Sequence, residues 1–150
     1  MSDVLAPQSV IAHLVVHDAA GALAFYTRAF GARELYRLTE PSGKIGHAEI
    51  VIGSSRVMLA DEYPDFGAIS AAAIGGSPIK LLIYVADVDA VMRQALAAGA
   101  TELRPVKNQF HGDRSGLVLD PFGLSWTIAT HVEDVTPDEM QRRFSAALAG

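Results

Sequence analysis

The feature of this sequence that most constrains its fold is an internal near-repeat, because the second half of the chain follows the plan of the first. An aspartate, Asp18 or Asp87, precedes a run of apolar residues at helical spacing, and each run ends at a Gly-Ala pair that begins at Gly31 or Gly99. After one further residue both copies continue with Glu-Leu, at a separation of 68 to 69 residues. That separation exceeds the roughly 20 to 50 residues typical of solenoid repeats. It predicts two copies of a βαβββ unit.

The first copy begins with a strand predicted over residues 10–16, which are rich in β-branched residues. Asp18 is a good N-cap for the helix that follows, and Gly31 stands where a left-handed C-cap is expected. Two further strand-like runs, residues 46–52 and 56–61, are joined by a Gly-Ser-Ser turn, which is typical of a hairpin. The apolar stripe of the helix consists of Ala19, Ala22, Leu23, Tyr26 and Phe30.

The second copy repeats this order. Residues 79–85 form an apolar run of strand length, and Asp87 is again a helix cap. After the helix, residues 116–119 and 125–130 are predicted strands, separated by an Asp-Pro-Phe-Gly turn. The apolar stripe of this helix consists of Val88, Val91, Met92, Ala95 and Leu96.

The chain is predicted to be a single domain with the halves at residues 8–65 and 79–132. Residues 66–78 between them are rich in small side chains, and a segment of this length suits either a covalent linker or a lid over a cavity.

A C-terminal helix is predicted over residues 137–148. Thr136 supplies an N-cap, Pro137 occupies the first helical position, and Glu139 completes a capping box. The face that carries Phe144 and several alanines is expected to pack on the body of the protein or on a second subunit.

Composition removes several classes of function. The 150 residues suffice for one domain that buries about 70% of the surface of its unfolded chain. The absence of cysteine excludes thiolate catalysis, zinc–thiolate sites and iron–sulfur ligation, which leaves histidine and carboxylate as the strong metal ligands. A net charge of −5, with the 12 Lys and Arg residues scattered, argues against nucleic acid as a partner. Without an apolar stretch of bilayer length or a basic secretory start, no membrane association and a cytoplasmic location are expected.

Three stretches together resemble one known superfamily: DAAGALAFYTRAFGA at residues 18–32, GHAEIVIG at 46–53 and DPFGLSW at 120–126. They are similar to the vicinal oxygen chelate superfamily, which contains glyoxalase I, extradiol dioxygenases, fosfomycin-resistance proteins and bleomycin-binding proteins. Residues 129–140, ATHVEDVTPDEM, resemble the PhnB-like branch. The resemblance implies an α+β fold in which duplicated βαβββ halves form a half-open cup of mixed sheet, with the helices outside.

The same resemblance allows the metal site of the superfamily to be checked. Its enzymes hold a divalent metal with one inward side chain from each of four strands. The corresponding positions here are Ile11, Leu59, Lys80 and Thr127. Three of these side chains are not usable ligands and the threonine is a poor one, because zinc, nickel and iron prefer imidazole and carboxylate. The resemblance therefore predicts no metal at the usual position and no cofactor, with a divalent metal at a displaced site as an alternative.

Alternation along the strands predicts what else lines the cup, since residues two apart share a face. The predicted polar lining is His13, Asp61, Lys80 and Tyr84, in an otherwise apolar cavity. The faces of His47 and Glu49 depend on the length of the hairpin turn, since a slip of one residue reverses both.

His13 has three possible roles. With His47, Glu49 or Asp61 it would hold a displaced metal, or it would act as a general base with Glu49 as an acid–base partner. The third possibility is a core histidine that hydrogen-bonds to one carboxylate or carbonyl.

The loop at residues 108–116 is the densest polar stretch of the second half. It resembles the Gln-Phe-Trp-Gly-Asp-Arg segment of the PhnB-like branch, with His111 where an aromatic residue is usual. Gln109, His111 and Arg114 are candidates to hydrogen-bond a ligand at the mouth of the cup. The alternative is a local ion pair between Asp113 and Arg114. Nearby, Trp126 is predicted to face the helices, while His17 and His131 are interpreted as ordinary residues at strand ends.

Two functions follow from these expectations. The first is a glyoxalase- or bleomycin-resistance-like protein that binds a small, partly aromatic molecule in an apolar cup without the usual metal. The second is a lyase or isomerase of the glyoxalase kind, which would use a displaced His/Glu site with or without a divalent metal. The resemblance also implies a homodimer.

Overall fold

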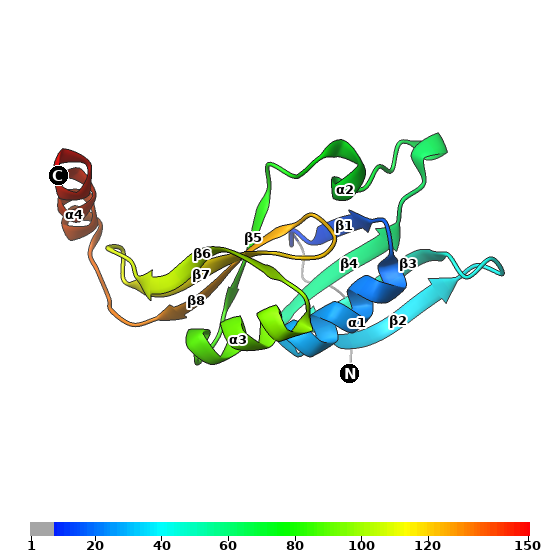
Figure 1. Ribbon diagram of the computed structural model, residues 1–150, viewed down its shortest axis with the longest axis horizontal. Coiled ribbons are helices and arrows are strands. Elements are labelled where there is room, and N and C mark those ends of the chain that lie inside the picture. Colours follow the sequence, from blue (N-terminus) through cyan, green and yellow to red (C-terminus); the bar gives the residue numbers. More distant parts are fainter. Residues whose placement is uncertain (1–7) are drawn as a thin grey trace.

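The computed structural model describes residues 8–150, and the first half of the chain forms one four-stranded mixed sheet with a helix (Figure 1). The strand order is β1-β4-β3-β2, with β1 parallel to β4 and the remaining pairs antiparallel. The elements are β1 (Ala12–Val16), α1 (Ala19–Phe30), β2 (Arg33–Thr39), β3 (Ile45–Ile52) and β4 (Ser55–Asp61).

The second half repeats the same plan, with strand order β5-β8-β7-β6 and β5 parallel to β8. Its elements are β5 (Lys80–Tyr84), α3 (Val88–Ala98), β6 (Thr101–Asn108), β7 (Asp113–Leu119) and β8 (Ser125–His131). The duplicated βαβββ fold is therefore confirmed, as two separate four-stranded sheets, and within residues 8–150 neither sheet closes into a barrel. Strand β7 begins three residues before the predicted start at 116.

The helix ends follow the capping signals of the sequence. The carboxylate of Asp18 accepts a hydrogen bond from the backbone N–H of Gly21 at 3.0 Å, and Asp87 caps α3 through Ala90 at 3.1 Å. Gly31 ends α1 in the left-handed conformation at φ 68°, which favours glycine because it has no Cβ. The repeated Asp and Gly residues therefore delimit both helices.

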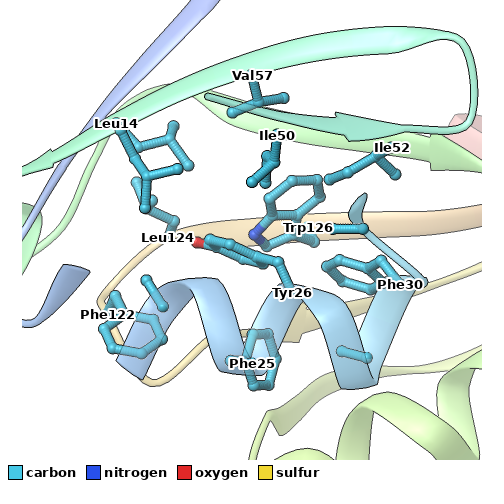
Figure 2. Packing of buried hydrophobic residues seen from close by; sticks show 14 of the residues in the cluster. Leu14, Phe25, Tyr26, Phe30, Ile50, Ile52, Val57, Phe122, Leu124 and Trp126 are labelled. Carbon is cyan, nitrogen blue, oxygen red and sulfur yellow. The ribbon is translucent and has the colours of Figure 1, made fainter. Parts of the chain in front are cut away.

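The two halves share one hydrophobic core, which lies around α1 and the helix-facing sides of the sheets. Trp126 of β8 packs against Phe30 and Tyr26 of α1, with ring centroids 4.8 Å and 5.4 Å apart (Figure 2). The carboxylate of Asp120 accepts hydrogen bonds from the Tyr26 hydroxyl at 2.5 Å and from the Trp126 indole N–H at 2.9 Å. A helix of the first half thus packs on a strand of the second. Trp126 faces the helices, as the strand alternation predicts.

Two further segments connect and extend the halves. Between them run a 3₁₀ turn, η1 (Pro64–Phe66), and a short helix, α2 (Ala71–Ile74), which contacts β1. The predicted C-terminal helix is α4 (Pro137–Ala149), and Figure 1 shows it at one extremity of the molecule, beyond β7. It is attached through Arg143, which pairs with Glu133, and through a ring contact of Phe144 with Phe110. Within residues 8–150 no helix has the length and apolar character needed to cross a membrane.

Candidate functional site

Each sheet buries one face in the shared core and leaves the other face open, and the open faces carry the polar side chains. We call them the first wall and the second wall. In the first half, β1 pairs His13 with Met58 of β4, and Met58 pairs with Glu49 of β3, so these residues share a face. In the second half, β8 pairs with β5 so that Thr127 and Ala129 lie beside Leu82 and Tyr84. The first wall carries Tyr36, His13, His47, Glu49, Arg56 and Met58; the second wall carries Lys80, Tyr84, Asp113, Thr127 and His131.

The first wall brings two histidines together. The imidazole rings of His13 and His47 have centroids 5.4 Å apart, and the ring of Tyr36 lies 5.9 Å from that of His47. His13 comes from β1 and His47 from β3, so the two rings meet across β4. On β4 the in-register partner of His13 is Met58, and Ala60, two residues further on the same face, is almost fully buried.

Glu49 is buried on the same wall and its charge is compensated. The side chain of Arg56 donates to one carboxylate oxygen at 2.6 Å, and the Tyr36 hydroxyl donates to the other at 3.3 Å. Only 3% of Glu49 is exposed. The register of the hairpin, which the sequence left open, therefore places both His47 and Glu49 on the same open face as His13, with β4 between them. It does not produce a His13–Glu49 hydrogen bond, and Glu49 is held by Arg56 instead.

Burial on this wall, and next the nearby His47, lower the pKa of His13 below the usual value of 6.5. Both effects disfavour the charged imidazolium. His13 is accordingly neutral near pH 7, and its ring nitrogens include one lone pair that can accept a proton or bind an electrophile.

The placement predicted for Leu59 and Asp61 is wrong. Leu59 pairs with Leu14 and is fully buried on the helix-facing side of the sheet. Asp61 lies on that side as well, where its carboxylate accepts hydrogen bonds from the backbone N–H groups of Ala19 at 2.8 Å and Ile45 at 2.7 Å. The predicted register of β4 is off by one residue. The charge of Arg56 indicates the correct register of β4, because a charged side chain favours the open face and positions 58 and 60 share the face of position 56.

The second wall contains a connected network around Asp113. The Tyr84 hydroxyl donates to Asp113 at 2.7 Å, and a ring nitrogen of His131 lies 3.1 Å from the other carboxylate oxygen. The second ring nitrogen of His131 lies 2.6 Å from Asp134. Tyr84 reaches Asp113 across Ala129 of β8, a small residue in the position that Ala60 has in the first half.

The pKa values on the second wall follow from these contacts. Burial raises the pKa of Asp113, but hydrogen bonds with Tyr84 and His131 outweigh it and lower the pKa below its usual value. Hydrogen bonds to Asp134 and then to Asp113 raise the pKa of His131. The hydrogen bond to Asp113 likewise raises the pKa of Tyr84. Sequence reasoning included Tyr84 but missed Asp113 and His131 as members of this network.

The loop residues predicted at the mouth of the cup separate in the structure. His111 lies near the network, with a ring nitrogen 3.9 Å from Asp113, and the Gln109 amide donates to the carbonyl of Ser115 at 3.4 Å. Arg114 instead forms a bidentate pair with Asp89 of α3, at 2.9 Å and 3.0 Å. The alternative of a local Asp113–Arg114 pair is wrong as well, since the partner of Arg114 is on the helix side. Its bond to Asp89 directs the guanidinium away from the second wall.

The four positions that correspond to the usual metal ligands do not suit a divalent metal. Leu59 is in the core, Ile11 is aliphatic, and Lys80 pairs in register with Ser125 on a different sheet from both. Thr127 offers only a hydroxyl. Within the described residues 8–150, no group of three or more His, Asp or Glu side chains lies close enough together to hold a metal ion.

Two cavities lie between the halves. One of about 640 Å³ is lined by Arg56, the β3–β4 turn and the length of β5, with Phe30 and Trp126 also contributing. The other, of about 520 Å³, runs along β1 and is lined on its opposite side by residues of the 69–79 segment, including Ile69 and Ile74. Tyr84 lines the first cavity and His13 the second. The segment between the halves thus borders a cavity as well as joining the halves.

Comparisons with known proteins agree with this architecture. Residues 8–128 match the model of the Glyoxalase/Bleomycin resistance protein/Dioxygenase superfamily. An uncharacterised protein of Mycobacterium tuberculosis is 42% identical over 137 residues, which covers 89% of this chain and 81% of the relative. Among solved structures, TioX from Micromonospora is similar with a TM-score of 0.65 and 30% identity over 83% of this chain and 99% of TioX. The PhnB protein from Bacillus cereus has a TM-score of 0.65 at 19% identity, over 82% of this chain and 99% of its own, a likeness of fold.

Proposed function

This chain belongs to the Glyoxalase/Bleomycin resistance protein/Dioxygenase superfamily, and from that premise we propose that it is a cytoplasmic protein of the PhnB-like branch that binds a small, partly aromatic molecule. The observation that carries the proposal is the pair of open walls, on which fixed polar side chains such as His13 and Tyr84 lie among apolar ones such as Met58 and Leu82. Such a combination suits a ligand that is held by its apolar surface and oriented by a few hydrogen bonds. His13 and His47 would contact it from the first wall, and Tyr84 and Thr127 from the second.

The other predicted site residues differ in whether they would contact the ligand. Lys80 is exposed at the edge of the second wall and is available for an anionic group on the ligand, while His111 and Gln109 lie at its end. Glu49 holds Arg56 and Tyr36 by hydrogen bonds, and the ring of Tyr36 in turn contacts His47. Leu59 and Asp61 contribute to the core, and Arg114 is held by Asp89, so the proposal leaves these three out of the ligand contacts.

We further propose that the functional unit is a homodimer in which the first wall of one chain faces the second wall of its partner. Within residues 8–150, β1 pairs only with β4 and β5 only with β8, so each has an unpaired edge. Leu38 on the first sheet and Leu82 on the second are more than half exposed, and Tyr84 is 60% exposed. A second copy of the chain would cover these apolar groups and bring the two polar sets to one cavity, using only surfaces that each chain already has.

Mixing of variants tests both parts together. In the proposed dimer, each of two cups combines the first wall of one chain with the second wall of the other. His13→Ala therefore removes a contact from the first wall of both cups, and Tyr84→Phe weakens the second wall of both. A heterodimer made from one chain of each kind would have one cup with both changes and one intact cup. Random exchange in an equimolar mixture makes about half of the dimers heterodimers. Binding of bleomycin, used as a partly aromatic probe and measured by calorimetry, should therefore return to about a quarter of the wild-type number of sites.

The controls separate the parts of the proposal. His17→Ala, which changes a histidine outside both walls, should bind the probe as the wild type does. Light scattering should give twice the 15.9 kDa mass of one chain. A 15.9 kDa particle would overturn the dimer, and unrestored binding in the mixture would place both walls of a cup in one chain. Turnover of a hemithioacetal or of catechol would replace the binding function by the lyase or isomerase alternative.

A further inference from the structure

The His13–His47 pair on the first wall has the spacing of two ligands to one ion. An imidazole nitrogen binds a late transition metal at about 2.0–2.1 Å, which places the centroids of two such rings roughly 5–6 Å apart. The observed centroids are 5.4 Å apart and the rings are tilted by 32°. The pair comes from β1 and β3, two strands that flank β4, so its spacing is fixed by the sheet and does not depend on a loop.

The surroundings of the pair leave the imidazoles free of acidic partners. Within residues 8–150 neither ring hydrogen-bonds to a carboxylate, in contrast to His131, which has two. Glu49 is an acidic residue on the same wall, but both of its oxygens already accept hydrogen bonds from Arg56 and Tyr36. The carboxylate oxygen that a hard or borderline divalent ion prefers is therefore committed elsewhere.

A third donor of different chemistry lies on the same face. Met58 pairs in register with His13 on one side and with Glu49 on the other, and it is partly exposed on the first wall. Its thioether is a soft, polarisable ligand that selects Cu(I) among the biological metals. The next residue of β4 on this face, Ala60, has a small side chain.

We propose that His13, His47 and Met58 form a binding site for Cu(I). The two imidazoles and the thioether supply three donors without a formal negative charge, which matches a soft monovalent cation. The site is displaced from the positions where relatives of this fold hold a divalent metal, and it is formed by one chain. It stands independently of the small-molecule function and of the homodimer.

Competition with a chromophoric Cu(I) chelator tests the proposal. The full chain is titrated anaerobically, with ascorbate present, into a bathocuproine disulfonate–Cu(I) solution, and loss of the chelator colour reports transfer. The wild type should take up one Cu(I) per chain. His13→Ala and His47→Ala should each weaken Cu(I) binding by more than the roughly 10- to 100-fold that loss of an outer-shell partner costs.

Matched variants identify the third ligand. Met58→Leu preserves volume and should weaken Cu(I) binding while leaving the much weaker binding of Zn²⁺ unchanged. Met140→Leu on α4 and His17→Ala should both bind Cu(I) as the wild type does. In a chain labelled with ¹³C at the methionine methyls, Ag(I), a diamagnetic stand-in for Cu(I), should shift the Met58 signal and leave that of Met140 in place.

Several outcomes would overturn the site. These are the absence of stoichiometric uptake by the wild type, equal affinity of wild type and His13→Ala, and an unshifted Met58 methyl. Equal Cu(I) affinity of Met58→Leu and the wild type would mean that the thioether is not a ligand. The argument for a soft ion would then fail. Far-ultraviolet circular dichroism of each variant establishes folding, and the methyl shift is measured on the unmutated chain, so misfolding of a variant cannot imitate either result.

Discussion

The two halves of this protein repeat one backbone plan but secure it with different side chains. At the start of α1, the backbone N–H of Ala19 donates to the carboxylate of Asp61, which is buried at the end of β4. At the start of α3, the N–H of Val88 donates at 2.9 Å to the hydroxyl of Thr130 near the end of β8. Both links join a helix start to the last strand of its unit. The fold requires an acceptor there, and either a charged or a neutral one serves.

A similar contrast separates the two walls. In each half, side chains from the first and third strands of the unit meet across the last strand, β4 or β8. Across β4 the pair is two imidazoles, and across β8 it is Tyr84 with the carboxylate of Asp113. The scaffold therefore fixes where polar groups converge, while the residue types decide the charge and protonation at that place.

The largest expected effect in this comparison comes from removing the charged acceptor of the first half. Asp61→Ala leaves the buried N–H groups of Ala19 and Ile45 without a partner, and should lower the free energy of unfolding by about 3 kcal/mol. Urea denaturation measures the change. Asp65→Ala, an exposed carboxylate in the 3₁₀ turn, is the control and should stay within about 0.5 kcal/mol of the wild type.

The ion pair of the first wall is expected to rank second. Arg56→Ala leaves the buried carboxylate of Glu49 with Tyr36 as its remaining hydrogen-bond donor of the two, and should cost about 2 kcal/mol, less than a fully buried pair because the arginine is partly exposed. The double variant Arg56→Ala, Glu49→Gln should recover part of the loss, because no uncompensated charge stays in place. Urea denaturation of both variants checks this, and an undiminished loss in the double variant would contradict the charge explanation.

The neutral acceptor of the second half should cost less. Thr130→Val keeps the shape of the side chain but removes the acceptor for Val88 and the donor to the carbonyl of Val85, so a loss of about 1 kcal/mol is expected. The same urea experiment measures it. A loss as large as that of Asp61→Ala would contradict the difference between a charged and a neutral link.

The smallest effect is a divergence of the two wall histidines with pH. His13, whose pKa is lowered in the folded state, favours folding as pH rises and opposes it as pH falls below about 6.5. His131, whose pKa is raised, contributes stability that is fully present below about 6.5 and is lost as pH rises through its folded pKa. Titration by NMR in metal-free buffer should place His13 below and His131 above the unperturbed value.

Two variants sharpen that titration. Removing the neighbouring ring in His47→Ala should raise the pKa of His13, and Asp134→Ala should lower the pKa of His131. Each substitution should shift the pKa of the histidine on its own wall more than that on the other wall, because the group removed contacts only the former. A common shift of both histidines would mean that the walls are electrostatically coupled.

The sequence was sufficient for what depends on local rules. Asp18, Gly31 and Asp87 delimit the helices where capping chemistry places them. His13 and Tyr84 lie on the open faces, where the alternation of side chains along a single strand places them.

What the sequence could not specify depends on contacts between strands. The register of β4 is set by its pairing with β1 and β3, so Leu59 and Asp61 were assigned to the wrong face by one residue. Asp113 and His131 come from two other strands to form the network with Tyr84. Arg114 pairs with Asp89 on a helix, 25 residues earlier in the chain. Apart from the charge of Arg56 in β4, none of these contacts has a signal within the local segment.

The packing of Trp126 on α1 has a consequence for how the chain unfolds. The only tryptophan of the protein belongs to the second half, yet its indole rests on a helix of the first and shares the carboxylate of Asp120 with Tyr26. Neither half can lose its structure without exposing aromatic surface of the other. The duplicated units are therefore one cooperative body: Trp126 fluorescence and backbone circular dichroism should report a single, coincident transition, and fragments cut between residues 66 and 78 should regain order only when mixed.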